Sequence, residues 1–291
     1  MTTAASPRHG RAGRGFTLVE MVVTLVLFAL IAVTLALFFR PAVDSWLAMR
    51  GRSRLAAEAD NAMRLMLREV RTAVPNSIRT PGTSCFELVP TKAGGRYRMG
   101  VDTVNAGSAP VDPAASTSSF DVLSPLASLP VAGDWVVVDN QNPGDVYSGA
   151  NRRQITGVST PAATVGAHRL AISPMQFPLG YDGGRFGVID QNTEAVFYVC
   201  SGASSTPDGS GNAPGVLVRL SHYGFNAAAP GSCPATTGGA VVATGLRSCR
   251  FLYDANQGAT QQSGFISLQL EFTRNGETAS LVTGAHVVNT P

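Results

Sequence analysis

Gly-Phe-Thr-Leu-Val-Glu at residues 15–20, followed by residues 21–39 without a single charge, decides the fold of the N-terminal part of this chain. As a helix that rises about 1.5 Å per residue, the segment 16–39 reaches roughly 36 Å, which exceeds the ~30 Å core of a bilayer. We therefore predict a membrane-spanning helix over residues 16–40. An ionised Glu20 inside it costs about 3 kcal/mol or more at mid-bilayer unless it finds a partner.

Three arginines precede this segment, Arg8, Arg11 and Arg14, without an acidic residue among the first fifteen. Basic residues beside a membrane span stay in the cytoplasm. We expect the N-terminus of the precursor to be cytoplasmic and the rest of the chain to lie on the outer side of the membrane.

The position of Gly15 separates this segment from an ordinary secretory signal, in which small residues follow the apolar stretch. A small residue ahead of the stretch resembles the type III signal of type IV pilins and type II secretion pseudopilins, in which prepilin peptidase cleaves between Gly and Phe and methylates the new amino terminus. The resemblance implies a leader of residues 1–15, cleavage between Gly15 and Phe16, and N-methylation of Phe16.

Glu20 then acquires a role in assembly. Cleavage creates an amine at Phe16, and a carboxylate on a neighbouring subunit can pair with it in a medium of low dielectric. The alternative is a chance glutamate near the membrane interface, where snorkelling lowers its cost.

Composition favours a β-rich domain outside the cytoplasm. The chain has 31 glycines and 18 prolines, and only 14% of its residues are charged. The net charge of +3 equals the three leader arginines, so the mature chain is formally neutral and we expect no nucleic-acid partner.

Four cysteines, Cys85, Cys200, Cys233 and Cys249, lie beyond the membrane segment, where oxidation is permitted. An even number predicts two disulfides, and sequence leaves three connectivities open. We favour Cys233 with Cys249 as a local loop, which leaves Cys85 for Cys200. Free buried thiols are the alternative, and the spacing does not suggest zinc.

Residues 41–75 change to an amphipathic pattern, which predicts a helical continuation that packs its apolar stripe on a domain. The stripe comprises Leu55, Ala59, Ala62, Met63, Met66, Val70 and Ala73.

Residues 76–291 predict an antiparallel β domain, so the fold class is α+β. Strands are expected at 85–89, 120–123, 135–139, 169–173, 196–200 and 216–222, and a closing hairpin at 265–288 turns at Asn275-Gly276. We predict surface loops at 106–119, 139–150 and 203–213, which are rich in Gly, Ser, Pro, Asp or Asn.

Motifs for catalysis or cofactors were not found, so we expect neither enzymatic activity, nor a cofactor, nor a metal site. Oxygen-rich residues at Asp139, Asn140, Asn142 and Asp145 leave calcium as an alternative to an ordinary surface turn.

Later stretches resemble the MshO-type minor pilins of the mannose-sensitive haemagglutinin (MSHA) pilus and PilW-like minor pilins. The residues that carry this resemblance are NSIR at 76–79, CFELVP at 85–90, GGRYR at 94–98, GDWVVV at 133–138, YSGANR at 147–152, YVC at 198–200 and VVNTP at 287–291.

This resemblance implies a pilin-like fold and an inner-membrane precursor that moves, after cleavage, into a pilus or pseudopilus. The expected partners are prepilin peptidase, the inner membrane, and other major and minor pilin subunits. Because Glu20 is present, the chain differs from the tip-most pseudopilins that lack this residue. The alternatives are a J-type pseudopilin of type II secretion, an adhesin module displayed at a tip, and an anchored periplasmic hydrolase.

Overall fold

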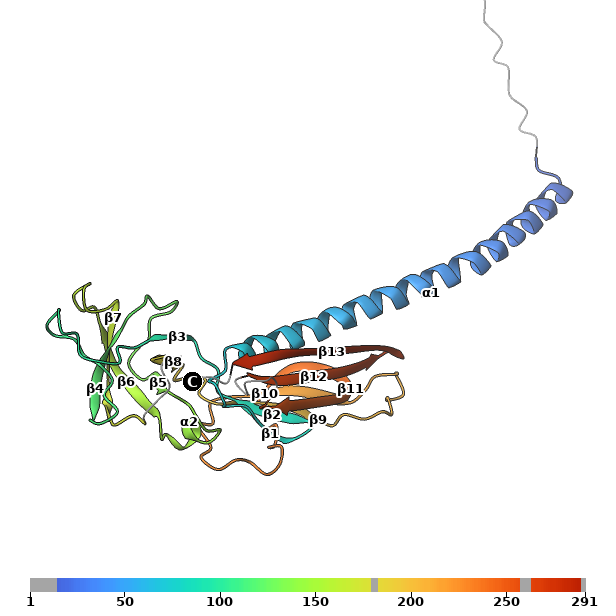
Figure 1. Ribbon diagram of the computed structural model, residues 1–291. Helices are drawn as coiled ribbons and strands as arrows, with labels where there is room; N and C mark the ends of the chain where they lie inside the picture. The colour runs from blue at the N-terminus through green and yellow to red at the C-terminus, as the bar shows by residue number, and fades with distance from the viewer. Residues whose placement is uncertain (1–14, 179–182, 257–262, 289–291) are drawn as a thin grey trace, which may run out of the picture. The chain divides into compact units, whose positions relative to one another are not determined.

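The computed structural model describes residues 15–178, 183–256 and 263–288 (Figure 1). Within these ranges, one long helix, α1 (Leu18–Arg71), precedes thirteen strands and one short helix. The chain divides into two compact units whose boundary falls inside α1, between Arg50 and Gly51. Of the described helices, α1 is the one long and apolar enough to cross a membrane. A long apolar helix continuing onto antiparallel sheets confirms the predicted α+β, pilin-like class.

The first sheet of the second unit has seven antiparallel strands. Its closing hairpin, β12–β13, turns at Asn275 and Gly276, which both have positive φ (52° and 77°). Such values are needed in a type I′ turn, and Asn-Gly is its preferred sequence, so the predicted hairpin is confirmed. In spatial order the strands are β1 (Arg79–Gly82), β2 (Cys85–Leu88), β9 (Val196–Ser201), β10 (Gly215–Leu220), β11 (Ala240–Asp254), β12 (Ser263–Arg274) and β13 (Glu277–Val288).

The last five turns of α1 pack on this first sheet. Six members of the predicted stripe are buried and Ala73 is half-buried. Their partners are core residues of the strands, among them Phe86, Tyr198 and Phe272. The amphipathic pattern therefore identified the contact face of the helix. Glu69, which is not a member of the apolar stripe, is also buried, at 8% exposure.

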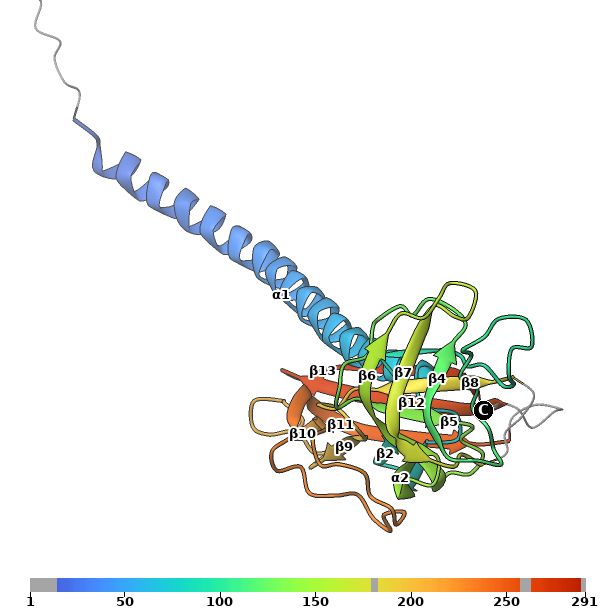
Figure 2. The ribbon, with the colours of Figure 1, turned by 90° about the vertical axis from the view of Figure 1, so that its left-hand side faces the viewer.

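A second, six-stranded sheet is inserted between the neighbouring strands β2 and β9. Figure 2 looks onto its strands β6, β7 and β4, which lie side by side. An antiparallel bridge between Tyr97 and Val122 joins the ends of its two edge strands, β3 and β4, so the sheet closes on itself as a small barrel. In spatial order its strands are β3 (Ala93–Arg96), β8 (Arg185–Ile189), β5 (Trp135–Val138), β6 (Arg152–Ser159), β7 (His168–Met175) and β4 (Thr117–Val122).

The barrel is filled by its own apolar side chains, including Phe120, Leu170 and Phe186, all at most 5% exposed. Small closed barrels leave room for side chains alone. The barrel is therefore a separate hydrophobic core within the second unit, in addition to the core between α1 and the first sheet.

The stretch 139–150, expected to be a surface loop, is buried in part. It forms the short helix α2 (Asp145–Ser148), in which Val146 and Tyr147 are at most 1% exposed. Asp139 and Asn140 are also buried, at 4% and 2%. The surface-loop prediction was wrong for these four residues, because they lie at the junction between the barrel and the first sheet, which composition does not reveal.

The cysteine pairing differs from the expected one. Cys85 is bonded to Cys233 and Cys200 to Cys249, with Cα separations of 5.7 and 6.3 Å. Cys233 lies in the segment before β11, with its Sγ 3.3 Å from Ser84 Oγ beside Cys85, whereas Cys249 lies within β11. Because Cys233 and Cys249 are each bonded to another cysteine, the expected pairing of Cys233 with Cys249, and with it that of Cys85 with Cys200, was wrong.

Candidate processing and assembly segment

The predicted cleavage site lies just outside the helix. Gly15, Phe16 and Thr17 precede α1, and Phe16 is 79% exposed. No atom lies within 4 Å of the position that a Cβ on Gly15 would occupy. A peptide bond in an exposed, non-helical segment is accessible to a peptidase. The remainder of the predicted leader, residues 1–14, lies outside the described residues.

Thr17 and Glu20 form a capping box at the start of α1. The backbone N–H of Thr17 donates to Glu20 Oε2 (3.3 Å), and the backbone N–H of Glu20 donates to Thr17 Oγ1 (3.3 Å). This reciprocal pair satisfies two N–H groups that a helix start otherwise leaves without partners. This capping box was not predicted, although Thr-x-x-Glu ahead of an apolar run is its known sequence signature.

The capping box directs the Glu20 carboxylate toward the chain terminus that cleavage would create. A negative charge at this end of a helix is also favoured by the helix dipole. The cap contributes about 1 kcal/mol, less than the ~3 kcal/mol cost of an unpaired ion in lipid. Local capping therefore orients Glu20 but leaves most of the cost of its charge without compensation.

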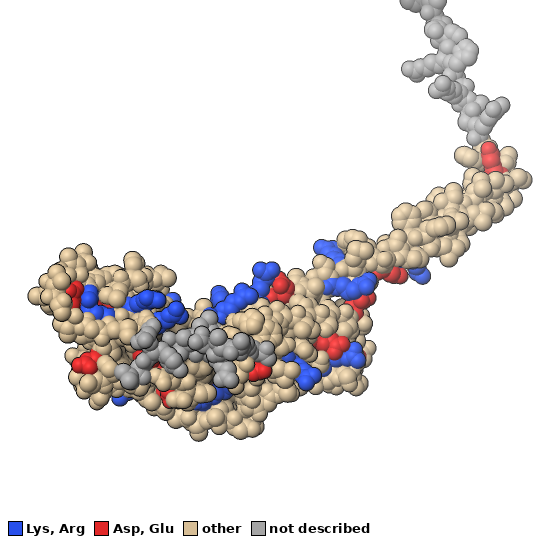
Figure 3. Space-filling model, in the orientation of Figure 1, with Lys and Arg blue, Asp and Glu red and all other residues tan. Residues whose placement is uncertain are grey.

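The N-terminal part of α1 has no protein cover of its own. All described residues from Phe16 to Leu47 are exposed, and Figure 3 shows this surface as almost entirely uncharged. The hydroxyls of Thr24 and Thr34 donate to carbonyls of their own helix at 2.9 Å, so they need no outside partner. Such an apolar surface requires lipid or other helices around it.

The C-terminal part of α1 is fixed to the first sheet by ion pairs as well as apolar contacts. Arg219 donates to both oxygens of the buried Glu69 (2.9 and 3.2 Å), and the hydroxyl of Tyr198 donates to the same carboxylate at 2.7 Å. Burial and the Glu69 charge together raise the pKa of Tyr198. Further pairs join Glu58 to Arg274 (2.9 Å) and Arg52 to Glu277 (3.3 Å).

The oxygen-rich stretch considered for calcium has other partners in the structure. Asp139 accepts a hydrogen bond from the Tyr97 hydroxyl at 2.8 Å, and burial raises its pKa. Asp145 accepts from the side chain of Asn142 at 2.9 Å. Within the described residues, no group of three or more His, Cys, Asp or Glu side chains is arranged to hold a metal ion.

Comparison with known proteins identifies the N-terminal segment. Residues 10–36 match the prokaryotic N-terminal methylation motif. No curated protein and no solved structure matches the chain. The match covers Gly15, Phe16 and Glu20, and with the apolar helix it indicates membrane anchoring. This chain therefore carries a type IV pilin-like prepilin signal, which implies processing by prepilin peptidase and assembly with other pilins.

Proposed function

We propose that this chain is a non-enzymatic minor pilin of the MshO type, which takes part in the assembly of an MSHA-type pilus. The observation that supports this most strongly is the combination of the prepilin motif with an uncovered apolar helix. In this proposal the precursor spans the inner membrane once. After cleavage, α1 leaves the bilayer for the apolar interior of a filament, and the disulfide-bonded domain remains outside.

Glu20 provides the electrostatic part of the proposal. It is the one ionisable group between Phe16 and Phe39, and the capping box orients it toward the new amine of Phe16. In a filament, the amine of an adjacent subunit can pair with it, which removes two isolated charges from an apolar medium at once.

Mass spectrometry of the protein from cells with an active prepilin peptidase tests the processing step. The expected species begins at Phe16 and carries an N-methyl group. A mature protein that still begins at Met1 in such cells would contradict the proposal. Capture with cognate MSHA subunits, and not with secretion subunits, would separate it from the J-type pseudopilin alternative.

A second candidate is a displayed adhesin module, which the inserted barrel favours. The barrel has its own core, and the loop after β3 carries Val101 and Val104 at 72% and 88% exposure. Exposed apolar side chains on loops of a rigid scaffold are a common form of binding surface. Binding of the full chain to a glycan or host surface, lost on replacement of both valines by serine, would support this candidate.

A further inference from the structure

The outer face of the barrel has an unusual set of cross-strand pairs between β3 and β8. Gly94 lies opposite Gly187, and Arg96 lies opposite Arg185. Alternate residues of the same strands, such as Phe186, belong to the barrel core, so these four residues face outward. Arg96 and Arg185 therefore lie beside the Gly94–Gly187 pair, which has no side chain on either strand.

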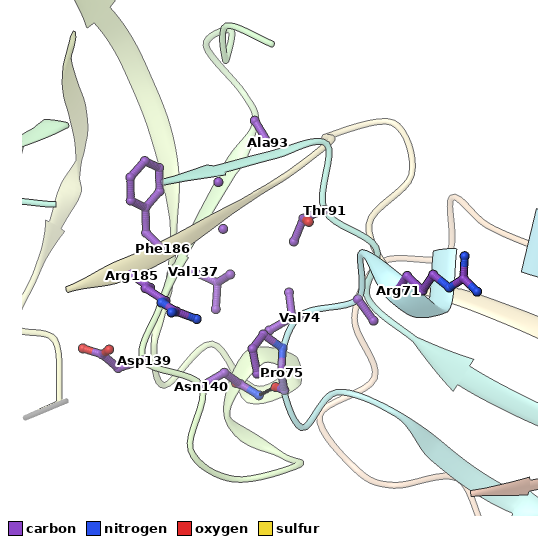
Figure 4. A pocket seen from close by; sticks show the side chains of 13 residues that line it. Arg71, Val74, Pro75, Thr91, Ala93, Val137, Asp139, Asn140, Arg185 and Phe186 are labelled. Atoms are coloured by element: carbon purple, nitrogen blue, oxygen red, sulfur yellow. Dashed lines mark hydrogen bonds between the residues drawn. The ribbon is translucent and has the colours of Figure 1, made fainter. Parts of the chain in front are cut away.

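The glycine pair forms part of a cavity of about 250 Å³ beside the end of α1 (Figure 4). A Cβ on Gly94 would lie 2.9 Å from the carbonyl oxygen of Phe186, and one on Gly187 would lie 3.0 Å from Thr91. A side chain at either position would therefore collide with its neighbours, which explains glycine at both. Its apolar wall comprises Val74, Pro75, Ala93, Val137 and Phe186.

Arg71 and Arg185 line this cavity, Arg96 lies beside it opposite Arg185, and within the described part of the chain none of the three has an acidic partner. Arg185 reaches toward the middle of the cavity in Figure 4, and Arg71 lies at the opposite rim. Among the described residues, no carboxylate oxygen lies within 4 Å of Arg71, Arg96 or Arg185, in contrast to arginines such as Arg219 and Arg274. Like charges directly opposite each other destabilise a sheet.

The one acidic residue in the lining does not neutralise these charges. Asp139 points away from Val74 and Pro75 in Figure 4, and it accepts the hydrogen bond from Tyr97. Arg71 also has a structural reason to be basic, because it belongs to the last turn of α1, where positive charge complements the helix dipole. Arg185 in the lining and Arg96 opposite it have no such structural role, and they are the groups that indicate a ligand.

We propose that this cavity binds an oxyanion, a carboxylate or phosphate carried on a small apolar body. Arg185 pairs with the oxyanion from the cavity lining and Arg96 from the position opposite it on β3, and the wall around Val74, Pro75 and Val137 contacts the body. Planar guanidinium groups suit carboxylate and phosphate oxygens, with which they form paired hydrogen bonds. A bound anion also offsets the repulsion between the two arginines.

Calorimetric titration of the full chain in detergent tests the proposal, with benzoate and inorganic phosphate as probes and sodium chloride at matched ionic strength as the blank. We expect both probes to bind, benzoate more tightly. Arg185→Gln and Arg96→Gln should each weaken binding at least tenfold. Arg250→Gln, at an exposed strand arginine away from the cavity, should change it less than twofold. Equal affinities in all four proteins would overturn the site, and equal affinity for both probes would overturn the role of the apolar wall.

Thermal unfolding gives a second readout that does not require tight binding. Without oxyanion at low ionic strength, Arg96→Gln should raise the Tm, because it removes the repulsion. Benzoate should raise the Tm of the wild type and not that of the variant. The same benzoate response in both proteins would mean general screening and would overturn the proposal.

An experiment in cells identifies the source of the oxyanion. If Arg185→Gln is no longer incorporated into filaments, the oxyanion is an acidic side chain of a neighbouring subunit. If Arg185→Gln is incorporated normally, the oxyanion belongs to a free small acid.

Discussion

The guanidinium of Arg79 on β1 lies 3.4 Å from the centre of the Tyr147 ring on α2. Arg79 also donates to the backbone carbonyl of Asn226 at 2.9 Å and lies 3.6 Å from the buried carboxylate of Glu87. The hydroxyl of Tyr147 donates to the carbonyl of Ser77 at 2.7 Å. One cation thus joins the first sheet, the inserted segment and the loop that follows β10.

Arg79→Ala should lower the free energy of unfolding by about 3–5 kcal/mol, because it leaves Glu87 buried without a cation. Burial already raises the pKa of Glu87. Urea unfolding of the detergent-solubilised chain measures the loss. Arg79→Ala combined with Glu87→Gln should recover part of it, since the uncompensated charge is then absent. A single variant within about 0.5 kcal/mol of wild type, as expected for an exposed arginine such as Arg250, would contradict this account.

Glu20 has two roles that substitution can separate. Glu20→Gln retains an oxygen for the capping box but removes the charge, and we expect filament incorporation to fall at least tenfold, as with Glu20→Ala. Thr17→Ala removes the cap, at a cost of about 1 kcal/mol, and should leave most of the incorporation. Immunoblotting of sheared filaments measures both, with membrane insertion as the control. Normal incorporation of Glu20→Gln would show that the charge is not required.

The two disulfides should be separable by paired substitutions. Removing Cys85 and Cys233 together eliminates one bridge, which should cost about 2–5 kcal/mol. Removing Cys85 and Cys200 together eliminates both bridges and leaves two free thiols, so the loss should be larger. Peptide mapping without reductant should show Cys85 linked to Cys233. Linkage of Cys233 to Cys249 would contradict the described pairing.

Asp139 makes stability depend on pH. Because burial raises its pKa above the ordinary 3.8, its protonated form is favoured in the folded state, and stability is lost as pH rises from about 4 through the folded pKa. Asn accepts the same hydrogen bond from Tyr97 and tolerates the positive φ of 50° at this position. The stability of Asp139→Asn relative to wild type should therefore increase between pH 4 and pH 8. A difference that is constant over this range would argue against a buried, titrating carboxylate.

The parts of the fold that sequence predicted are those with strong local patterns. The uncharged run, the three- and four-residue spacing of the α1 stripe, and Asn275-Gly276 each specify local structure without help from distant residues. Of the described strands, β1, β3, β6, β8 and β11 were not predicted, since each contains a glycine, which is depleted in strands and weakens the local strand pattern. They are strands because their neighbours supply hydrogen bonds and apolar cover.

The candidate functional residues also divide into those that local sequence predicts and those that depend on the fold. Gly15, Phe16 and Glu20 were found from their order in the sequence, because the signal is linear. The ion pair of Glu69 with Arg219 joins residues 150 positions apart, and the oxyanion cavity depends on which strands of the barrel are neighbours. Neither the ion pair nor the cavity could be predicted from the spacing of residues along the chain, because both depend on the order of strands in the sheets, which the sequence did not reveal.

The insertion of the barrel between β2 and β9 has a consequence for how such a subunit can change. Leu88 and Val196 are paired across the two strands, so the chain leaves the first sheet and returns to almost the same place. Closing a loop of about a hundred residues costs roughly 3 kcal/mol more than closing a four-residue turn, and a barrel that folds early, with its two stems together, removes most of this difference. Recombination at these two stems can therefore exchange the whole barrel without changing any residue of α1 or of the strands of the first sheet.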